Sequence, residues 1–138
     1  MRAYFDSSAF VKRYVTETGS QEVLDRCRTA DPVVLSALSL PEISSFLNRL
    51  VRNRQLAAAD YVLFKQVIMK DLSGVEVRAI SEGILMDSVH VLEECRIKTL
   101  DAIHIATARQ ARCDLFLTAD RQQYDAAILM GLKSERVG

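Results

Sequence analysis

Short apolar segments alternate with helical segments along this chain, and the alternation restricts the folds available to it. The short segments are RAYFD at 2–6, VVLS at 33–36, VEVRAI at 75–80 and LFLT at 115–118. Helical spacing or composition marks the segments 8–15, 21–29, 40–53, 56–72, 82–95, 99–112 and 121–131. Because strands separated by helices form layered folds, we predict a three-layer α/β/α sandwich around a mostly parallel sheet.

Length and composition fit one compact domain spanning 1–138. With 138 residues, of which 49% are hydrophobic, the chain can bury a core without disulfides or a structural metal. The 18 basic and 18 acidic residues cancel, and this balance neither favours nor excludes nucleic acid, because local patches attract a polyanion. Cys27, Cys95 and Cys113 lie far apart in the sequence, which favours reduced thiols. We expect a cytoplasmic protein, because the sequence shows neither a signal peptide nor a membrane span.

Three acidic residues come after predicted strands. Asp6 ends the first strand, Glu42 follows the second and Asp120 follows the fourth. The carboxyl ends of parallel strands share one edge of the sheet, and ligands bind at that edge. Each residue also has a structural interpretation: Asp6 and Asp120 could be helix N-caps, and Glu42 with Ser39 matches a capping box. The sequence leaves Asp6 open between the two interpretations and, for Glu42 taken alone, favours the capping box.

Carboxylates that converge on one edge repel one another, and a divalent cation relieves that repulsion. Oxygen ligands suit Mg²⁺ or Mn²⁺ better than zinc. Asp101 follows Thr99, a candidate cap, and lies in the first turn of a helix, where the dipole favours negative charge. Its helix follows another helix, so spacing does not bring it to the same edge. His104 could flank a site, although a structural role is the more common outcome for such a histidine.

Four sequence strings, in order, resemble the PIN domain family over nearly the whole chain. They are YFDSSAFVKRY at 4–14, PEISS at 41–45, LDAIHIATA at 100–108 and LTAD at 117–120. The length is most similar to the VapC toxins of toxin–antitoxin pairs. The resemblance implies an acidic site of four residues, in which Asp6 and Asp101 bind magnesium directly and Glu42 and Asp120 hold a metal or its waters.

The resemblance also assigns supporting roles near this site. Ser7 would orient Asp6, and Thr118 would support the pocket. The family often has a further acid or asparagine shortly after the position of Asp120. Arg121, Gln122 and Gln123 stand there in this chain, and the sequence does not show whether Asp125 faces the site.

The function implied by the resemblance is a Mg²⁺-dependent endoribonuclease that hydrolyses single-stranded RNA, with Mn²⁺ as a possible substitute. It would be the toxin of a type II toxin–antitoxin pair, a homodimer whose antitoxin docks on the apolar helices within 40–72. A non-catalytic PIN-like binding module and an RNA-processing nuclease that is not a toxin are the alternatives. Lys12, Arg13 and Arg121 are candidate RNA contacts, as are Arg49, Arg52 and Arg54, although each could instead belong to an ordinary solvated helix face.

Overall fold

The computed structural model describes residues 1–138 and contains a sheet of five parallel strands. The strand order is β3-β2-β1-β4-β5, and all four neighbouring pairs are parallel. The bounds of the strands are Ala3–Phe5 (β1), Val33–Ser36 (β2), Glu76–Arg78 (β3), Leu115–Thr118 (β4) and Ser134–Arg136 (β5). The predicted strands at 2–6, 33–36 and 115–118 therefore form the centre of the sheet, and the one at 75–80 lies at an edge.

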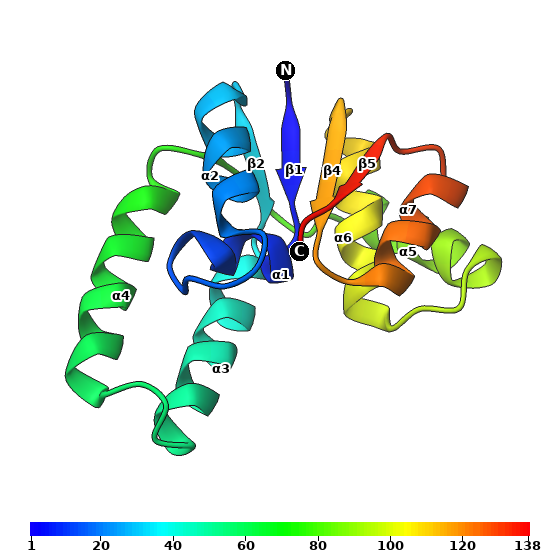
Figure 1. The fold of residues 1–138 in the computed structure, drawn as a ribbon. Helices are drawn as coiled ribbons and strands as arrows, with labels where there is room; N and C mark the ends of the chain where they lie inside the picture. The colour runs from blue at the N-terminus through cyan, green and yellow to red at the C-terminus, as the bar shows by residue number, and fades with distance from the viewer.

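Helices cover both faces of this sheet, which confirms the predicted three-layer sandwich (Figure 1). Their bounds are Ser7–Phe10 (α1), Ser20–Thr29 (α2), Ser39–Arg52 (α3), Ala58–Leu72 (α4), Glu82–Glu94 (α5), Thr99–Gln110 (α6) and Arg121–Leu129 (α7), with a 3₁₀ turn at Val11–Arg13 (η1). Residues of α1 to α4 share one apolar core with the sheet, and residues of α5 to α7 share the other. None of the helices is long and apolar enough to cross a membrane.

Side-chain alternation along the central strand connects the two cores. Ala3 and Phe5 point into the core beneath α1 to α4, whereas Tyr4 between them points into the core beneath α5 to α7. All three are fully buried. A strand that is buried on both faces has no solvent-exposed positions, which is why β1, β2 and β4 appear in the sequence as mostly apolar runs.

The boundaries differ from the sequence prediction mainly near the two ends of the chain. The predicted helix 8–15 is a single α-helical turn, α1, followed by the 3₁₀ turn η1. Strand β5 was not predicted, because its sequence, Ser-Glu-Arg, is short and polar. It pairs only with β4, at the edge of the sheet, where a strand needs little apolar character. Gly131, at φ 87°, follows the end of α7 as predicted.

The strand order identifies where a ligand would bind. The chain runs from the central β1 outward through β2 and β3, then crosses to the other side of β1 to form β4 and β5. Beyond their carboxyl ends, β1 and β4 therefore form a topological switch point, the usual position of ligand sites in open α/β sheets. Asp6 directly follows β1, and Asp120 lies two residues beyond β4.

Candidate active site

Asp6 is held in a buried position at the switch point. Its side chain is only 3% exposed. Its carboxylate accepts hydrogen bonds from Ser8 Oγ at 2.8 and 2.9 Å and from the Ala9 backbone N–H at 2.9 Å, and Thr118 Oγ1 lies 2.9 Å away. Burial raises the pKa of Asp6 to about 6 in spite of these hydrogen bonds. Asp6 is thus both the N-cap of α1 and a desolvated acid at the edge of the sheet.

Glu42 lies in the first turn of α3 and accepts two hydrogen bonds on the same oxygen. Ser7 Oγ donates to Glu42 Oε1 at 2.7 Å, and His104 Nε2 forms a short hydrogen bond with that atom. Burial raises the pKa of Glu42, but the hydrogen bond and electrostatic interaction with His104, together with the hydrogen bond from Ser7, outweigh burial and lower the pKa below its usual value. The prediction that Ser7 orients Asp6 is therefore corrected: Ser7 orients Glu42, and the next residue, Ser8, contacts Asp6.

The capping box predicted for Ser39 and Glu42 is not formed. The N-cap of α3 is Leu38, without a side-chain hydrogen bond, so Ser39 is already the first residue of the helix. Glu42 is turned toward Ser7 and His104 instead. The hydroxyl of Ser39 is left fully buried with no hydrogen-bond partner.

This unsatisfied hydroxyl leads to a stability prediction. The Ser39→Ala variant should be more stable than the wild type by about 1 kcal/mol, because the substitution removes a buried polar group that makes no hydrogen bond. Urea denaturation measures the change. Ser36→Ala is the matched control, because the Ser36 hydroxyl is equally buried but accepts a hydrogen bond from the Leu38 N–H at 3.1 Å. Equal losses of stability in both variants would contradict this account.

Asp120 is the N-cap of α7, where its carboxylate accepts a hydrogen bond from the Gln123 N–H at 2.8 Å. Gln123 is completely buried, and its amide lies between two parts of the site. Its Oε1 is 2.9 Å from Thr118 Oγ1, and its Nε2 donates to the backbone carbonyl of Asp101 at 3.3 Å. Gln123 therefore fixes the start of α6 relative to the end of β4.

Asp101 is in the first turn of α6, half-buried, and its carboxylate makes no hydrogen bond or ion pair with another residue. The predicted cap Thr99 is wrong, since Lys98 is the N-cap and provides no side-chain hydrogen bond. Burial raises the pKa of Asp101, and the negative charges of Asp120 and Glu42 raise it further. The structure thus brings Asp101 electrostatically close to two of the other acids, which spacing alone did not predict.

The four acids do not form a complete metal cage by themselves. No three aspartate, glutamate, histidine or cysteine side chains are placed to hold one ion together. Asp6 and Glu42 accept hydrogen bonds from hydroxyls, whereas Asp101 is unpaired. This donor set fits a cation held by one or two carboxylates with water completing its shell, which is how Mg²⁺ usually binds to proteins.

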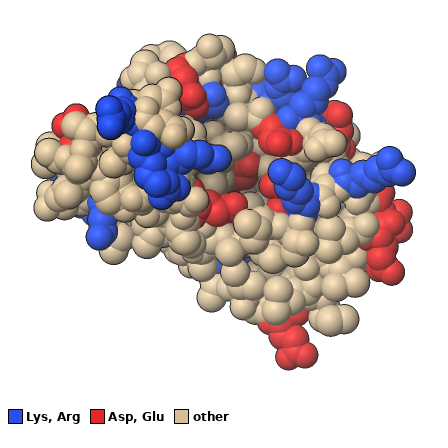
Figure 2. All heavy atoms as spheres, turned by 90° about the horizontal axis from the view of Figure 1, so that it is seen from below, with Lys and Arg blue, Asp and Glu red and all other residues tan.

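A hollow of about 300 Å³ opens beside this acidic cluster. Its lining includes Ser7, Ser8 and Glu42 together with Arg49, an exposed residue of α3 whose guanidinium also lies over the Phe46 ring. Figure 2, which views the molecule from below the strand ends, shows acidic side chains in a hollow with basic side chains on both sides. This arrangement suits a polyanion that approaches an acidic centre through positive flanks.

Two of the basic residues predicted to contact RNA have structural partners. Lys12 is 8% exposed; it donates to the Thr18 carbonyl at 2.6 Å and pairs with Glu17 at 3.2 Å. Arg13 pairs with Asp71 at 3.5 Å. Lys12 is thereby held inside the fold, whereas Arg13 keeps 32% of its side-chain surface exposed. Arg121 is exposed and next to Asp120. Arg121 and Arg13 therefore stay candidate RNA contacts.

Comparison with known proteins agrees with this geometry. The family model described as "PIN domain" matches residues 3–129, which include all four acids. The chain belongs to the PIN domain family. The ribonuclease VapC46 of Mycobacterium tuberculosis is 34% identical over 137 residues, covering 94% of this chain and 92% of the relative.

Two solved structures share the PIN fold. VapC20 of Mycobacterium tuberculosis, described as a toxin that cleaves the sarcin-ricin loop, superimposes with a TM-score of 0.70 at 15% identity, covering 97% of this chain and 98% of the other. A toxin–antitoxin complex from Klebsiella pneumoniae superimposes with a TM-score of 0.67 at 21% identity, covering 88% and 89% of the two chains.

Sequence reasoning missed several residues that support this PIN site. Ser8 donates a hydrogen bond to Asp6, and Tyr4 bonds to His104, the partner of Glu42. Gln123 donates to the backbone carbonyl of Asp101. The sequence did place Gln123 three positions after the candidate N-cap Asp120. That spacing indicates only a backbone N–H that the cap can bond, and it does not predict the tertiary contacts of the Gln123 side chain. Asp125, left open by the sequence, is exposed and lines a separate hollow with Glu94 and Arg96.

Proposed function

We propose that this chain is a divalent-metal-dependent endoribonuclease that cleaves single-stranded RNA by hydrolysis and is the toxin of a type II toxin–antitoxin pair. The observation that carries the proposal is its 34% identity, over 94% of its length, with a protein named as a ribonuclease. The placement of Asp6, Glu42, Asp101 and Asp120 near the switch point supports the same activity.

The proposed metal is Mg²⁺, with Mn²⁺ as a substitute. Asp6 and Asp101 would bind it directly, and Glu42 and Asp120 would hold its waters or a second ion. When bound, the cation would lower the pKa of a water and neutralise charge on the phosphate. Asp101 is well suited to this role, because its carboxylate has no partner in the protein, and burial and its acidic neighbours raise its pKa.

The residues of the chain would bind and orient the RNA around that centre. Arg49 lies on one flank of the hollow, and exposed Arg121 is next to Asp120; both would contact phosphates. Water would be the nucleophile, which leaves a 5′-phosphate and a 3′-hydroxyl. Attack through the ribose 2′-hydroxyl usually uses a pair of histidines. Here His90 is exposed on α5 while His104 is buried in α6, so they do not form such a pair.

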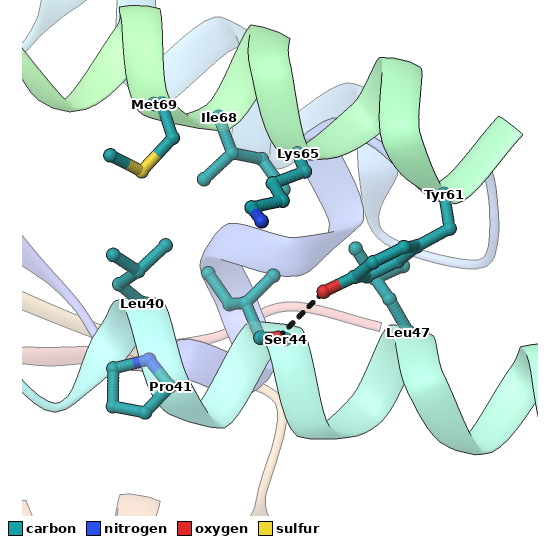
Figure 3. A pocket seen from close by; sticks show the side chains of 9 residues that line it. Leu40, Pro41, Ser44, Leu47, Tyr61, Lys65, Ile68 and Met69 are labelled. Carbon is teal, nitrogen blue, oxygen red and sulfur yellow. Dashed lines mark hydrogen bonds between the residues drawn. The ribbon is translucent and has the colours of Figure 1, made fainter. Parts of the chain in front are cut away.

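An antitoxin segment would dock between α3 and α4, where an apolar hollow of about 270 Å³ opens. Figure 3 shows Tyr61, Lys65 and Met69 projecting from α4 toward Leu40, Ser44 and Leu47 on α3, with the Tyr61 hydroxyl 3.0 Å from Ser44 Oγ. An amphipathic helix could fill such a groove with its apolar face. The solved toxin–antitoxin complex from Klebsiella pneumoniae supports a protein partner of this kind. A homodimer is part of the same proposal.

The test is RNA cleavage by the purified chain, freed of any copurifying protein. We expect cleavage of single-stranded RNA with Mg²⁺ or Mn²⁺, none with EDTA, and 5′-phosphate ends on the products. Cleavage that persists in EDTA, or products with cyclic phosphates, would contradict the metal-assisted hydrolysis. No cleavage of any RNA would instead favour a non-catalytic binding module.

The toxin assignment needs its own measurement. Expression of the wild type should arrest growth, and co-expression of the cognate antitoxin should relieve the arrest. A wild type that cleaves RNA in vitro without slowing growth would favour an RNA-processing nuclease over a toxin.

A further inference from the structure

A chain of buried hydrogen bonds leads from the centre of the sheet to the active-site acid Glu42. Tyr4 Oη lies 2.6 Å from His104 Nδ1, and His104 Nε2 bonds to Glu42 Oε1. We infer that Tyr4 and His104 form a positioning pair that sets the orientation of the Glu42 carboxylate. This inference rests on the proposed function, because it assigns a role within that site, and neither residue is itself proposed to touch RNA or metal.

The position of the Tyr4 hydroxyl indicates where the histidine proton lies. Tyr4 is completely buried in β1, and its phenol carries one O–H donor. In the inferred pair the phenol donates this hydrogen to His104 Nδ1, 2.6 Å away. Because Nδ1 is then an acceptor, the ring proton is on Nε2, from which it points at Glu42 Oε1. One tautomer satisfies all three groups.

The consequence for Glu42 is that its two oxygens are no longer equivalent. Oε1 receives both the His104 N–H and the Ser7 hydroxyl, at 2.7 Å for Ser7. Oε2 accepts no hydrogen bond from the protein. Glu42 also lines the hollow beside the acidic cluster and keeps 26% of its side-chain surface exposed, whereas His104 keeps 1%. His104 and Ser7 thus hold one oxygen and leave the other available to a metal-bound water or to substrate.

The position of His104 connects this orientation to Asp101. His104 is three residues after Asp101 on α6, so both side chains lie on one face of that helix. Tyr4 anchors this face to β1. Asp6 follows Tyr4 by two residues and lies directly after the end of β1. The pair therefore connects β1, which ends at Asp6, with α6, which carries Asp101, and with Glu42. A small shift of the His104 ring would move the Glu42 carboxylate directly.

Nuclear magnetic resonance of the ring nitrogens tests the proton placement without metal or RNA. The chain has 2 histidines, and the His90→Gln variant removes the exposed one, which assigns the signals of His104. We expect a single tautomer with its proton on Nε2, and a loss of that single tautomer in Tyr4→Phe. A wild-type ring protonated at Nδ1, or one that averages between tautomers, would overturn the inference.

Mn²⁺ binding, followed by the paramagnetic resonance of the free ion, and RNA cleavage test the consequence. His104→Leu should weaken both by about 10- to 100-fold, and Tyr4→Phe by about 10-fold, the usual effect of losing a group that orients a ligand. His104→Gln, which keeps an N–H near the position of Nε2, should restore both to within about threefold of the wild type. His90→Gln should change neither.

The outcomes separate this inference from the proposed function. If His104→Leu, folded by circular dichroism, binds Mn²⁺ and cleaves RNA like the wild type, the positioning role is overturned while the ribonuclease remains. If the wild type does not cleave RNA but His104→Leu still loses Mn²⁺ affinity and His104→Gln recovers it, the proposed function fails and the positioning pair stands. Failure of His104→Gln to recover either property would also count against the pair.

Discussion

Replacing Asp6 or Asp101 by asparagine should lower RNA cleavage by on the order of 10³-fold, comparable with the loss of a group that stabilises charge in the transition state. The reason is the loss of a negative charge at the centre of the proposed metal site. We expect the two variants to stay folded, so that activity and stability separate. Initial cleavage rates at saturating Mg²⁺ and thermal unfolding of the same samples measure the two properties.

The surroundings of each acid explain why folding should survive. The asparagine that replaces Asp6 keeps an acceptor for the Ala9 N–H, and the hydroxyls of Ser8 and Thr118 can rotate to accept from its amide. Asp101 has no hydrogen bond to lose, and its charge is opposed by Asp120 and Glu42. Each substitution removes a charge that the folded chain holds unfavourably, so stability at neutral pH should be unchanged or higher. Such a trade of stability for activity is typical of active sites.

Asp60→Asn is the matched control for both variants. Asp60 is also in the first turn of a helix, α4, but it is exposed and apart from the acidic cluster. It should neither slow cleavage nor change the melting temperature appreciably. Wild-type rates in Asp6→Asn and Asp101→Asn would show that the acidic cluster is not the catalytic centre. Loss of activity together with unfolding would show that the acids are structural.

The sequence was sufficient for four of the five strands and for the positions of two of the acids, for a physical reason. A parallel strand buried on both faces must be an apolar run, and an acid directly after such a run must lie at the carboxyl edge. Asp6 and Asp120 were predicted in this way. Glu42 was placed near the edge, but its partners were not, because Ser7 and His104 lie 35 and 62 residues away along the chain.

Local patterns misled where a tertiary contact competes with a capping preference. The Ser39–Glu42 pair has the spacing of a capping box, yet two stronger partners hold Glu42 elsewhere. Ser7 and Ser8 are adjacent and chemically identical, so only the turn into α1 decides which contacts Asp6. The sequence analysis assigned Asp101 to the site only because of the family resemblance. In the structure, Gln123 holds the start of α6 against the end of β4.

The raised pKa of Asp6 predicts how stability depends on pH in the metal-free protein. The folded-state pKa of about 6 exceeds the ordinary value of 3.8, so between these values the folded chain binds more protons than the unfolded chain. The stabilisation is complete below about pH 4 and is lost as the pH rises through 6. The difference corresponds to roughly 3 kcal/mol of unfolding free energy at neutral pH.

Urea denaturation of the wild type and Asp6→Asn in EDTA, from pH 4 to pH 7.5, measures this contribution as the difference between two curves. Other groups cancel in that difference, including Glu42, whose lowered pKa acts in the opposite sense. Asp6→Asn should gain on the wild type as the pH rises, and Asp60→Asn should follow the wild type throughout. Parallel curves for the wild type and Asp6→Asn would mean that Asp6 titrates normally. Mg²⁺ or Mn²⁺ should flatten the wild-type curve alone, because a bound cation stabilises the charged Asp6 that burial opposes.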